Sequence, residues 1–167
     1  MKKISLFLLT LTMLGINARA QFNDRICHIE CVQSGRALDA DSHELNRNGT
    51  KVQLWDNNHG DNQKWRFKEV GPGIYIIECV QSGRVLDANS HELNRNGTKV
   101  QLWDRVGGEN QKWRLKEVGH DVFIIECVAN GRVLDADSHT INQNGTKVQL
   151  WDRSGGENQK WRIYGAR

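Results

Sequence analysis

The sequence predicts an all-β fold in which twelve strands form three pseudo-symmetric repeats of 48 residues. The first observation is an exact repeat, because Asn-Gly-Thr-Lys-Val-Gln-Leu-Trp-Asp begins at Asn48, Asn96 and Asn144. The second is that each repeat has four strand-like segments, whereas no window shows sustained helical periodicity. A four-stranded unit of this size cannot bury its own apolar face, so three must close around a common axis. This arrangement is a β-trefoil, since a propeller usually has at least four blades.

The first two strands are clearest in the second repeat. Ile74 to Val80 is rich in β-branched and aromatic residues and predicts a strand. Ser82-Gly83 supplies a turn, and the short apolar run Val85-Leu86 predicts the second strand. The repeats have the same layout without insertions and occupy about residues 26–73, 74–121 and 122–167.

The third and fourth strands follow polar loops. Asn89 to Arg95 is one loop, and Asn96-Gly97 favours a hairpin that leads into a strand from Thr98 to Trp103. Residues 105–110 form a glycine-containing loop. Polar and apolar residues then alternate from Gln111 to Val118, which predicts a half-buried strand.

The N-terminus has the pattern of a secretory signal peptide. Lys2 and Lys3 precede an apolar run from Ile4 to Leu14, and the triplet Ala18-Arg19-Ala20 follows. This pattern predicts a signal peptide of residues 1–20, cleaved before Gln21. The apolar run is too short for a comfortable membrane span, so we expect no membrane insertion. The mature chain, residues 21–167, is expected to be secreted, or periplasmic if the source is bacterial.

The predicted cleavage also removes the net charge. The formal charge of the full chain is +3, and residues 1–20 contain three basic residues and no acid, so the mature chain has a charge of 0. A neutral protein has no long-range attraction to nucleic acid or anionic membranes, and we expect neither partner. The mature length is ordinary for one domain with a core, and a monomer is favoured.

Four cysteines raise the question of disulfides in an exported chain. Three of them occupy the same position in each repeat: Cys31, Cys79 and Cys127. Cys27 and Cys31 are four residues apart on a predicted strand, which separates them too far to bridge each other. We interpret the repeated cysteines as small buried hydrophobic residues, with a disulfide as the alternative.

A motif at the end of each repeat carries a family resemblance. Asn-Gln-Lys-Trp-Arg begins at Asn62, Asn110 and Asn158, and each repeat also has Leu-Asp-Ala followed by Val-Gln-Leu-Trp. The chain resembles the ricin B-type lectins, also called R-type lectins or family 13 carbohydrate-binding modules, whose hallmark is a Gln-x-Trp in each trefoil lobe. The resemblance covers nearly the whole mature chain and implies a carbohydrate-binding β-trefoil over residues 21–167.

A sugar offers fixed hydroxyls and an apolar face, so its site needs an aromatic ring and converging polar groups. The resemblance implies that an aspartate of each repeat accepts hydrogen bonds from adjacent sugar hydroxyls: Asp39, Asp87 and Asp135. It places a tryptophan under the sugar ring: Trp55, Trp103 and Trp151. An asparagine would bond a ring hydroxyl, and the next glutamine would support the aspartate: Asn62 and Gln63, Asn110 and Gln111, Asn158 and Gln159. A further glutamine matches the pattern as an additional contact: Gln53, Gln101 and Gln149.

Several of these residues also have a structural interpretation. The tryptophans within Gln-x-Trp are assigned to the core, because the alternation of the last strand turns them inward: Trp65, Trp113 and Trp161. Strand-end hydrogen bonding is an alternative for the aspartates, and packing is one for the other tryptophans. We favour binding because polar residue types that are costly to bury repeat together with the tryptophan.

Three other sequence patterns give weaker evidence for a functional site. Asp39 and Asp41 with Asn46 suggest a calcium loop, but Asn89 replaces Asp41 in the second repeat and no bidentate Glu closes an EF-hand spacing. The repeated histidines lack a second ligand at metal spacing: His43, His91 and His139. We expect no metal and no cofactor. Asn48, Asn96 and Asn144 each begin a glycosylation sequon, which hairpin-turn chemistry also explains.

The predicted function is therefore a secreted lectin with three sites and no enzymatic activity. By resemblance the ligand is galactose or its N-acetylated form, followed by xylan- or arabinan-type sugars. The loop between Trp55 and Asn62 is two residues shorter than in ricin's sugar-binding lobes, which leaves the exact sugar open. Residues such as Ala37 and Asn57 also stand where the plant lectins have disulfide cysteines.

Three other functions are kept as alternatives. One is a glycan-targeting module of a polysaccharide-degrading or toxin system. Another is a glycosidase that uses Asp39 with Glu30 or Glu69 as the second carboxylate, although one 48-residue unit seldom forms a deep catalytic cleft. The third is a trefoil protease inhibitor or signalling protein, which would not need three matched sets of Asp, Trp and Asn-Gln.

Overall fold

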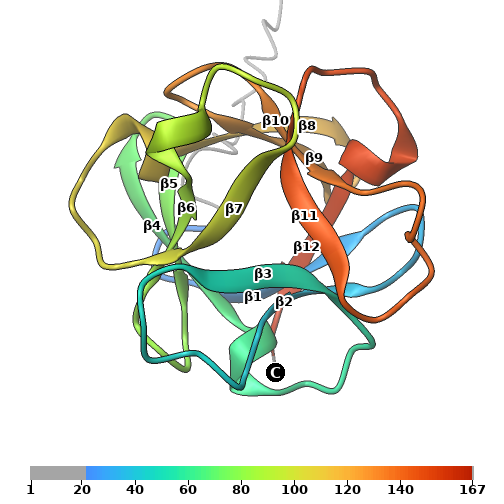
Figure 1. Ribbon diagram of the computed structural model, residues 1–167, viewed down its shortest axis with the longest axis horizontal. Coiled ribbons are helices and arrows are strands. Elements are labelled where there is room, and N and C mark those ends of the chain that lie inside the picture. The colour runs from blue at the N-terminus through green and yellow to red at the C-terminus, as the bar shows by residue number, and fades with distance from the viewer. Residues whose placement is uncertain (1–21, 167) are drawn as a thin grey trace, which may run out of the picture.

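The computed structural model describes residues 22–166, so the predicted signal peptide lies outside the described residues. Twelve strands surround a common three-fold axis, and none of the described residues is α-helical (Figure 1). The strands are β1 (Ile26–Cys31), β2 (Ala37–Ala40), β3 (Thr50–Trp55), β4 (Trp65–Gly71), β5 (Ile74–Cys79), β6 (Val85–Ala88), β7 (Thr98–Trp103), β8 (Trp113–Gly119), β9 (Val122–Cys127), β10 (Val133–Ala136), β11 (Thr146–Trp151) and β12 (Trp161–Gly165). The predicted all-β class and strand number are confirmed.

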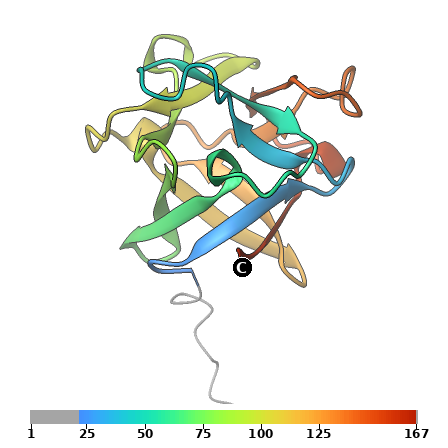
Figure 2. The ribbon, with the colours of Figure 1, turned by 90° about the horizontal axis from the view of Figure 1, so that it is seen from below.

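The strand pairing is that of a β-trefoil. Six strands form a closed antiparallel ring in the order β1, β4, β5, β8, β9 and β12, which leaves this barrel without a free edge. Three hairpins, β2–β3, β6–β7 and β10–β11, form a second layer. Their longer strands β3, β7 and β11 pair with one another around the axis. The side view shows the barrel strands crossing obliquely (Figure 2).

The core contains the tryptophans that the strand alternation turned inward. Trp65, Trp113 and Trp161 are each 0% exposed, which confirms their core assignment. Their indole Nε1 groups donate to main-chain oxygens of the neighbouring hairpins at 2.9, 2.9 and 3.0 Å, so no polar atom of these rings is buried without a partner. All four cysteines are buried free thiols, which leaves packing rather than disulfides to stabilise the fold.

Phe22 packs into the same core against aromatic residues of the barrel. Its side chain is 5% exposed, and its ring centroid lies 5.4 Å from that of Phe67 and 5.3 Å from that of Phe123. The segment that leads into β1 thus adds an aromatic side chain to the shared core. No helix among the described residues is long and apolar enough to cross a membrane.

One local prediction was wrong. Gln111 does not begin the fourth strand but ends the 3-10 helix η4 (Glu109–Gln111), because its side-chain oxygen accepts the N–H groups of Val106 and Gly107 and holds the chain in a turn. The predicted hairpin is confirmed, because β6 and β7 pair antiparallel and Asn96-Gly97 is a turn directly before β7, at the end of a loop of residues 89–97. The N–H of Gly97 also donates to Leu150 of the third repeat, so this dipeptide joins two repeats.

Candidate functional site

A buried carboxylate is the centre of the site in the first repeat. Asp39 on β2 lies opposite Gln53 on β3 and is 3% exposed. Its Oδ1 accepts from Gln53 Nε2 at 3.1 Å, and its Oδ2 accepts from Asn62 Nδ2 at 2.8 Å and Gln63 Nε2 at 2.9 Å. A carboxylate has about four acceptor positions, so the protein leaves about one for a ligand.

The 3-10 helix η2 (Asp61–Gln63) brings both amides to this carboxylate. Asn62 Nδ2 also donates to the main-chain oxygen of Ala40 at 2.9 Å, which uses both of its hydrogens. A sugar hydroxyl can therefore bond only to Asn62 Oδ1, as a donor. Gln63 also donates to the main-chain oxygen of Asp56 at 3.0 Å and accepts from the N–H of Asn58 at 3.0 Å, so it positions the loop as well as the carboxylate.

The same arrangement recurs almost unchanged in the other repeats. Asp87 accepts from Gln101 at 3.1 Å and from Asn110 and Gln111 at 2.9 Å each. Asp135 accepts from its own three amides at 3.2, 2.8 and 3.0 Å: Gln149, Asn158 and Gln159. Every predicted polar residue thus joins one of three separate hydrogen-bonded sets.

Burial raises the pKa of all three carboxyls, and the three amide hydrogen bonds on each oppose this rise. The amides compensate part of the desolvation that a buried carboxylate suffers, and they fix the direction of its remaining lone pair. A carboxylate prepared in this way is a strong acceptor for a hydroxyl group.

The predicted stacking residues lie at the ends of β3, β7 and β11. Trp55, Trp103 and Trp151 are 37%, 37% and 41% exposed, in contrast to the buried core tryptophans. In the third repeat, Trp151 and Asp135 line one pocket of about 440 Å³. A partly exposed aromatic ring beside a held carboxylate offers one apolar and one polar contact to the same small ligand.

The pocket also has lining residues that the sequence interpretation missed. They come from the loop after β10 and the loop after β11: Asp137, Ser138, His139 and Ser154. The repetition of Asp-Ser-His at residues 41–43 and 137–139 was the available signal. The side chains of His43 and His139 are 89% and 91% exposed, so these rings lie at the rim.

In each site, a glycine of the preceding repeat lies next to the predicted stacking tryptophan. Gly49 has a φ of +89°, which disfavours other residues, and a Cβ there would lie 4.0 Å from Cζ3 of Trp103 and 3.9 Å from Oε1 of Gln101. The sequon asparagines are part of these contacts. Their Nδ2 atoms donate to aspartates of the next repeat at 2.9 Å in each case: Asn48 to Asp104, Asn96 to Asp152 and Asn144 to Asp56.

The two glutamates considered as second carboxylates of a glycosidase each have a hydrogen-bond partner of their own. Glu30 accepts a hydrogen bond from the hydroxyl of Tyr164, and Glu69 accepts from the N–H of Gly73 at 3.3 Å. Neither bonds to Asp39 or its amides. Among the described residues, no group of three or more His, Cys, Asp or Glu side chains is placed to hold a metal ion.

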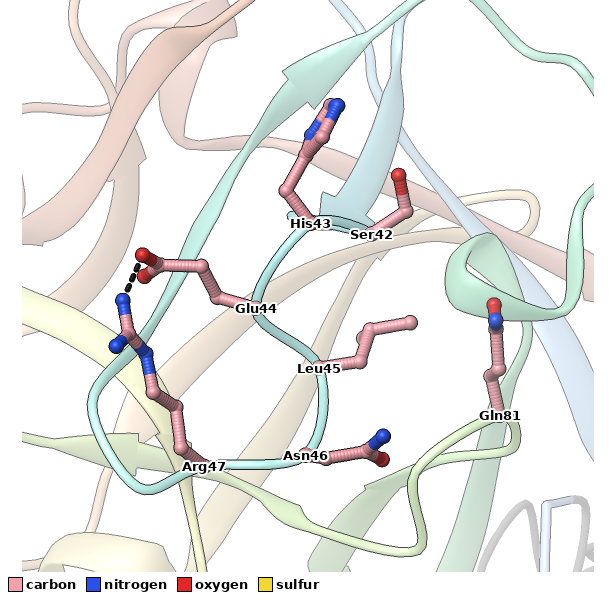
Figure 3. A pocket seen from close by; sticks show the side chains of 7 residues that line it. All are labelled: Ser42, His43, Glu44, Leu45, Asn46, Arg47 and Gln81. Carbon is pink, nitrogen blue, oxygen red and sulfur yellow. Dashed lines mark ion pairs between the residues drawn. The ribbon is translucent and has the colours of Figure 1, made fainter.

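A larger hollow of about 630 Å³ adjoins the loop of residues 42–47 (Figure 3). Figure 3 shows an ion pair between Glu44 and Arg47 on one side and Leu45 directed toward Gln81 of the next repeat. Its lining contains no Trp, Tyr or Phe and neither Asp39 nor its amide partners. It lacks the combination needed for a sugar, so we place the site at the Asp and Trp sets.

The fold and the three sets define a β-trefoil with repeated aromatic and polar sites, the architecture of a carbohydrate-binding protein. The family model described as ricin-type beta-trefoil lectin domain matches residues 25–161, and the chain belongs to this family. No curated protein matches the sequence.

Three solved structures show the same fold. A designed three-fold symmetric protein, ThreeFoil, is 30% identical with a TM-score of 0.78, over 83% of this chain and 96% of that one. The exo-beta-1,3-galactanase 1,3Gal43A from Clostridium thermocellum is 26% identical with a TM-score of 0.80, over 86% of this chain but only 30% of that one. The Rhizoctonia solani agglutinin is 25% identical with a TM-score of 0.74, over 85% of this chain and 95% of that one.

Proposed function

We propose that this protein is a secreted, non-catalytic lectin with three glycan sites. The observation that carries the proposal is the repeated pairing of a partly exposed tryptophan with a carboxylate held by three amides. The tryptophan supplies a surface for the C–H face of a sugar, and the carboxylate and asparagine oxygens accept hydrogen bonds from its hydroxyls. Membership of the ricin-type lectin domain family supports the same function.

Galactose and N-acetylgalactosamine are the proposed sugars, with xylan- or arabinan-type sugars next. The similarity to part of an exo-beta-1,3-galactanase supports a galactose-type ligand. The same similarity favours the second candidate function, a module that directs a polysaccharide-degrading enzyme to its glycan, because the match covers only 30% of that chain.

Three sites on one rigid body favour multivalent adhesion. A single shallow sugar site usually binds weakly, and linking several sites raises overall avidity by roughly 10² to 10⁴ when their geometry fits the target. Densely presented surface glycans are therefore the proposed target.

The test is a glycan array and calorimetry with galactose and N-acetylgalactosamine, using the wild type and Trp55→Ala/Trp103→Ala/Trp151→Ala. Tryptophans are chosen because an alanine in place of Asp39 would leave three amides without their acceptor. The control is Val70→Ala/Val118→Ala, at two apolar residues that are 42% and 43% exposed outside the sites. We expect the triple variant alone to lose at least tenfold in affinity, about 1.4 kcal/mol per site. Undiminished binding by the folded triple variant would remove the tryptophans from the sites, and a wild type without glycan binding contradicts the lectin proposal.

A further inference from the structure

Two of the residues that line the pocket of the third repeat differ between repeats, Asp137 and Ser154. Ser154 corresponds to the uncharged Asn58 and Val106, so only the position of Asp137 changes a charge. Asp137 lines the pocket of the third repeat together with Asp135. Asp41 is its equivalent in the first repeat, but Asn89 takes this position in the second. The Ser-His pair that follows is the same in all three repeats, so within this turn only the Asp or Asn side chain changes.

Asn89 keeps the local geometry of the aspartates. Asp41 Oδ1 accepts the backbone N–H of His43 at 3.0 Å, and Asp137 Oδ1 accepts that of His139 at 3.0 Å. Asn89 Oδ1 accepts the equivalent N–H of His91 at 3.1 Å. The second repeat therefore keeps this hydrogen bond and loses the negative charge. The aspartates also lie 3.0 Å from the ring Nδ1 of His43 and His139, whereas Asn89 caps the 3-10 helix η3 (Ser90–Glu92).

Hydrogen bonds to Asp41 and Asp137 favour the charged form of these two side chains. The backbone hydrogen bond from His43 lowers the pKa of Asp41, whose side chain is 26% exposed, and the one from His139 acts in the same way on Asp137. Burial raises the pKa of Asp39 and Asp135, and the charges of Asp41 and Asp137 add to this rise. Asp137 lines the pocket of the third site, and Asp41 is its equivalent in the first. The first and third sites thus each contain two carboxylates.

A lysine lies at the edge of every site. Lys99 donates to the main-chain oxygen of Gly49 at 2.9 Å, and a Cβ on Gly49 would lie 4.0 Å from Lys99 Nζ and 4.0 Å from Cζ3 of Trp103. The ammonium group of Lys99 and the ring of Trp103 therefore both lie close to Gly49. Lys51 and Lys147 occupy this place in the other sites, where their charge acts on Asp41 and Asp137. In the second site the position of these aspartates is taken by the neutral Asn89, whose N–H donates to the main-chain oxygen of Lys99 at 2.9 Å.

We propose that the second site accepts glycans that carry a negative charge, as a sugar carboxylate or sulfate, whereas the first and third sites disfavour them. The inference rests on the proposed lectin function. In the first and third sites an anionic sugar meets two carboxylates and one ammonium group, but in the second it meets one of each. Removing one unit charge about 6 Å from the ligand changes affinity about three- to tenfold in a largely aqueous setting.

The experiment uses proteins that keep one stacking tryptophan. Trp55→Ala/Trp151→Ala retains the second site, and Trp103→Ala/Trp151→Ala retains the first. Each protein is titrated with galactose, galactose 6-sulfate and galacturonic acid, and the affinity for each charged sugar is divided by the affinity for galactose. This ratio is measured again after Asn89→Asp in the protein that retains the second site and after Asp41→Asn in the protein that retains the first. Each substitution introduces the residue that another repeat has at this position, so folding is expected to be preserved.

We expect Asn89→Asp to lower this ratio about three- to tenfold and Asp41→Asn to raise it by a similar factor. Both changes should shrink in 1 M salt, where charges are screened. The sulfate and the uronic acid titrations show which anion the second site takes. Ratios that do not change with either substitution overturn this inference while leaving the lectin proposal intact. A wild type that binds none of the three sugars would instead count against the galactose-type lectin proposal itself.

Discussion

The side chain of Asn48 holds Asp104 at two points, because its Oδ1 accepts the Asp104 N–H at 2.7 Å and its Nδ2 donates to the carboxylate at 2.9 Å. Asp104 directly follows Trp103, so the first repeat fixes the backbone that carries the stacking ring of the second. Arg84 Nε also donates to Asn48 Oδ1 at 3.2 Å. The exposed tryptophans are therefore positioned by contacts between repeats.

Replacing Asn48 with alanine should weaken both the fold and the second site. Three hydrogen bonds between repeats are lost on an exposed surface, and we expect a decrease in unfolding free energy of about 1–2 kcal/mol. Urea denaturation measures this decrease, and sugar titration should show weaker binding at one of three sites. Asn46→Ala, at an exposed asparagine of the same loop, is the control. If Asn48→Ala matches this control in both measurements, the positioning role is wrong.

Gln63→Leu tests the support of the carboxylate in the first site. The substitution removes a donor to Asp39 and to the oxygen of Asp56, and it leaves the N–H of Asn58 without its acceptor. We expect a loss of about 2–3 kcal/mol in unfolding free energy and the loss of one binding equivalent in calorimetry. Gln33→Leu, at an exposed glutamine, serves as the matched control. Three full binding equivalents in Gln63→Leu would exclude this role.

Acidification should abolish binding before it unfolds the protein. Burial raises the pKa of Asp39 above its usual value of 3.8, so the acceptor charge is lost at a pH above 3.8 as pH falls. Since the folded state has the raised pKa, protonating this group favours folding, and that stabilisation disappears as pH rises through the folded-state pKa. Asp137 has a lowered pKa, so its contribution to stability is present above 3.8 and is lost only as pH falls through its folded-state value.

The measurement is sugar affinity and near-ultraviolet circular dichroism over the same pH series. Binding should weaken above pH 3.8 while the aromatic signal is still native. Binding that persists until the aromatic signal is lost would contradict the proposed role of the carboxylates.

Phe22→Ala should destabilise the whole trefoil without altering the sites. The ring is 5% exposed and contacts aromatic residues of the barrel, and deletion of a buried phenylalanine side chain costs about 3–5 kcal/mol. Phe22→Leu retains an apolar side chain and should lose clearly less. Equal unfolding free energies for the wild type and Phe22→Ala would mean that Phe22 does not close the core in solution.

Local patterns predicted most of the fold. The segment from Thr98 to Trp103 is a strand with the expected bounds, and Trp113 is buried as the alternation indicated. Those features depend on neighbouring residues in the sequence. Gln111 was misplaced in a strand because its turn depends on hydrogen bonds to the N–H groups of Val106 and Gly107, which periodicity does not show.

The sequence by itself determined the three-fold repetition, the strand content and the presence of an Asp, Trp and Asn-Gln set in every repeat. Only the tertiary structure decided which atoms of these sets are available to a ligand. Both hydrogens of Asn62 Nδ2 are already used, and the side chain of Asn48 joins two repeats in addition to preceding β3. The physical reason is that these hydrogen bonds connect segments far apart in the chain, and each bond formed within the protein removes a lone pair or a proton from the surface that a sugar meets.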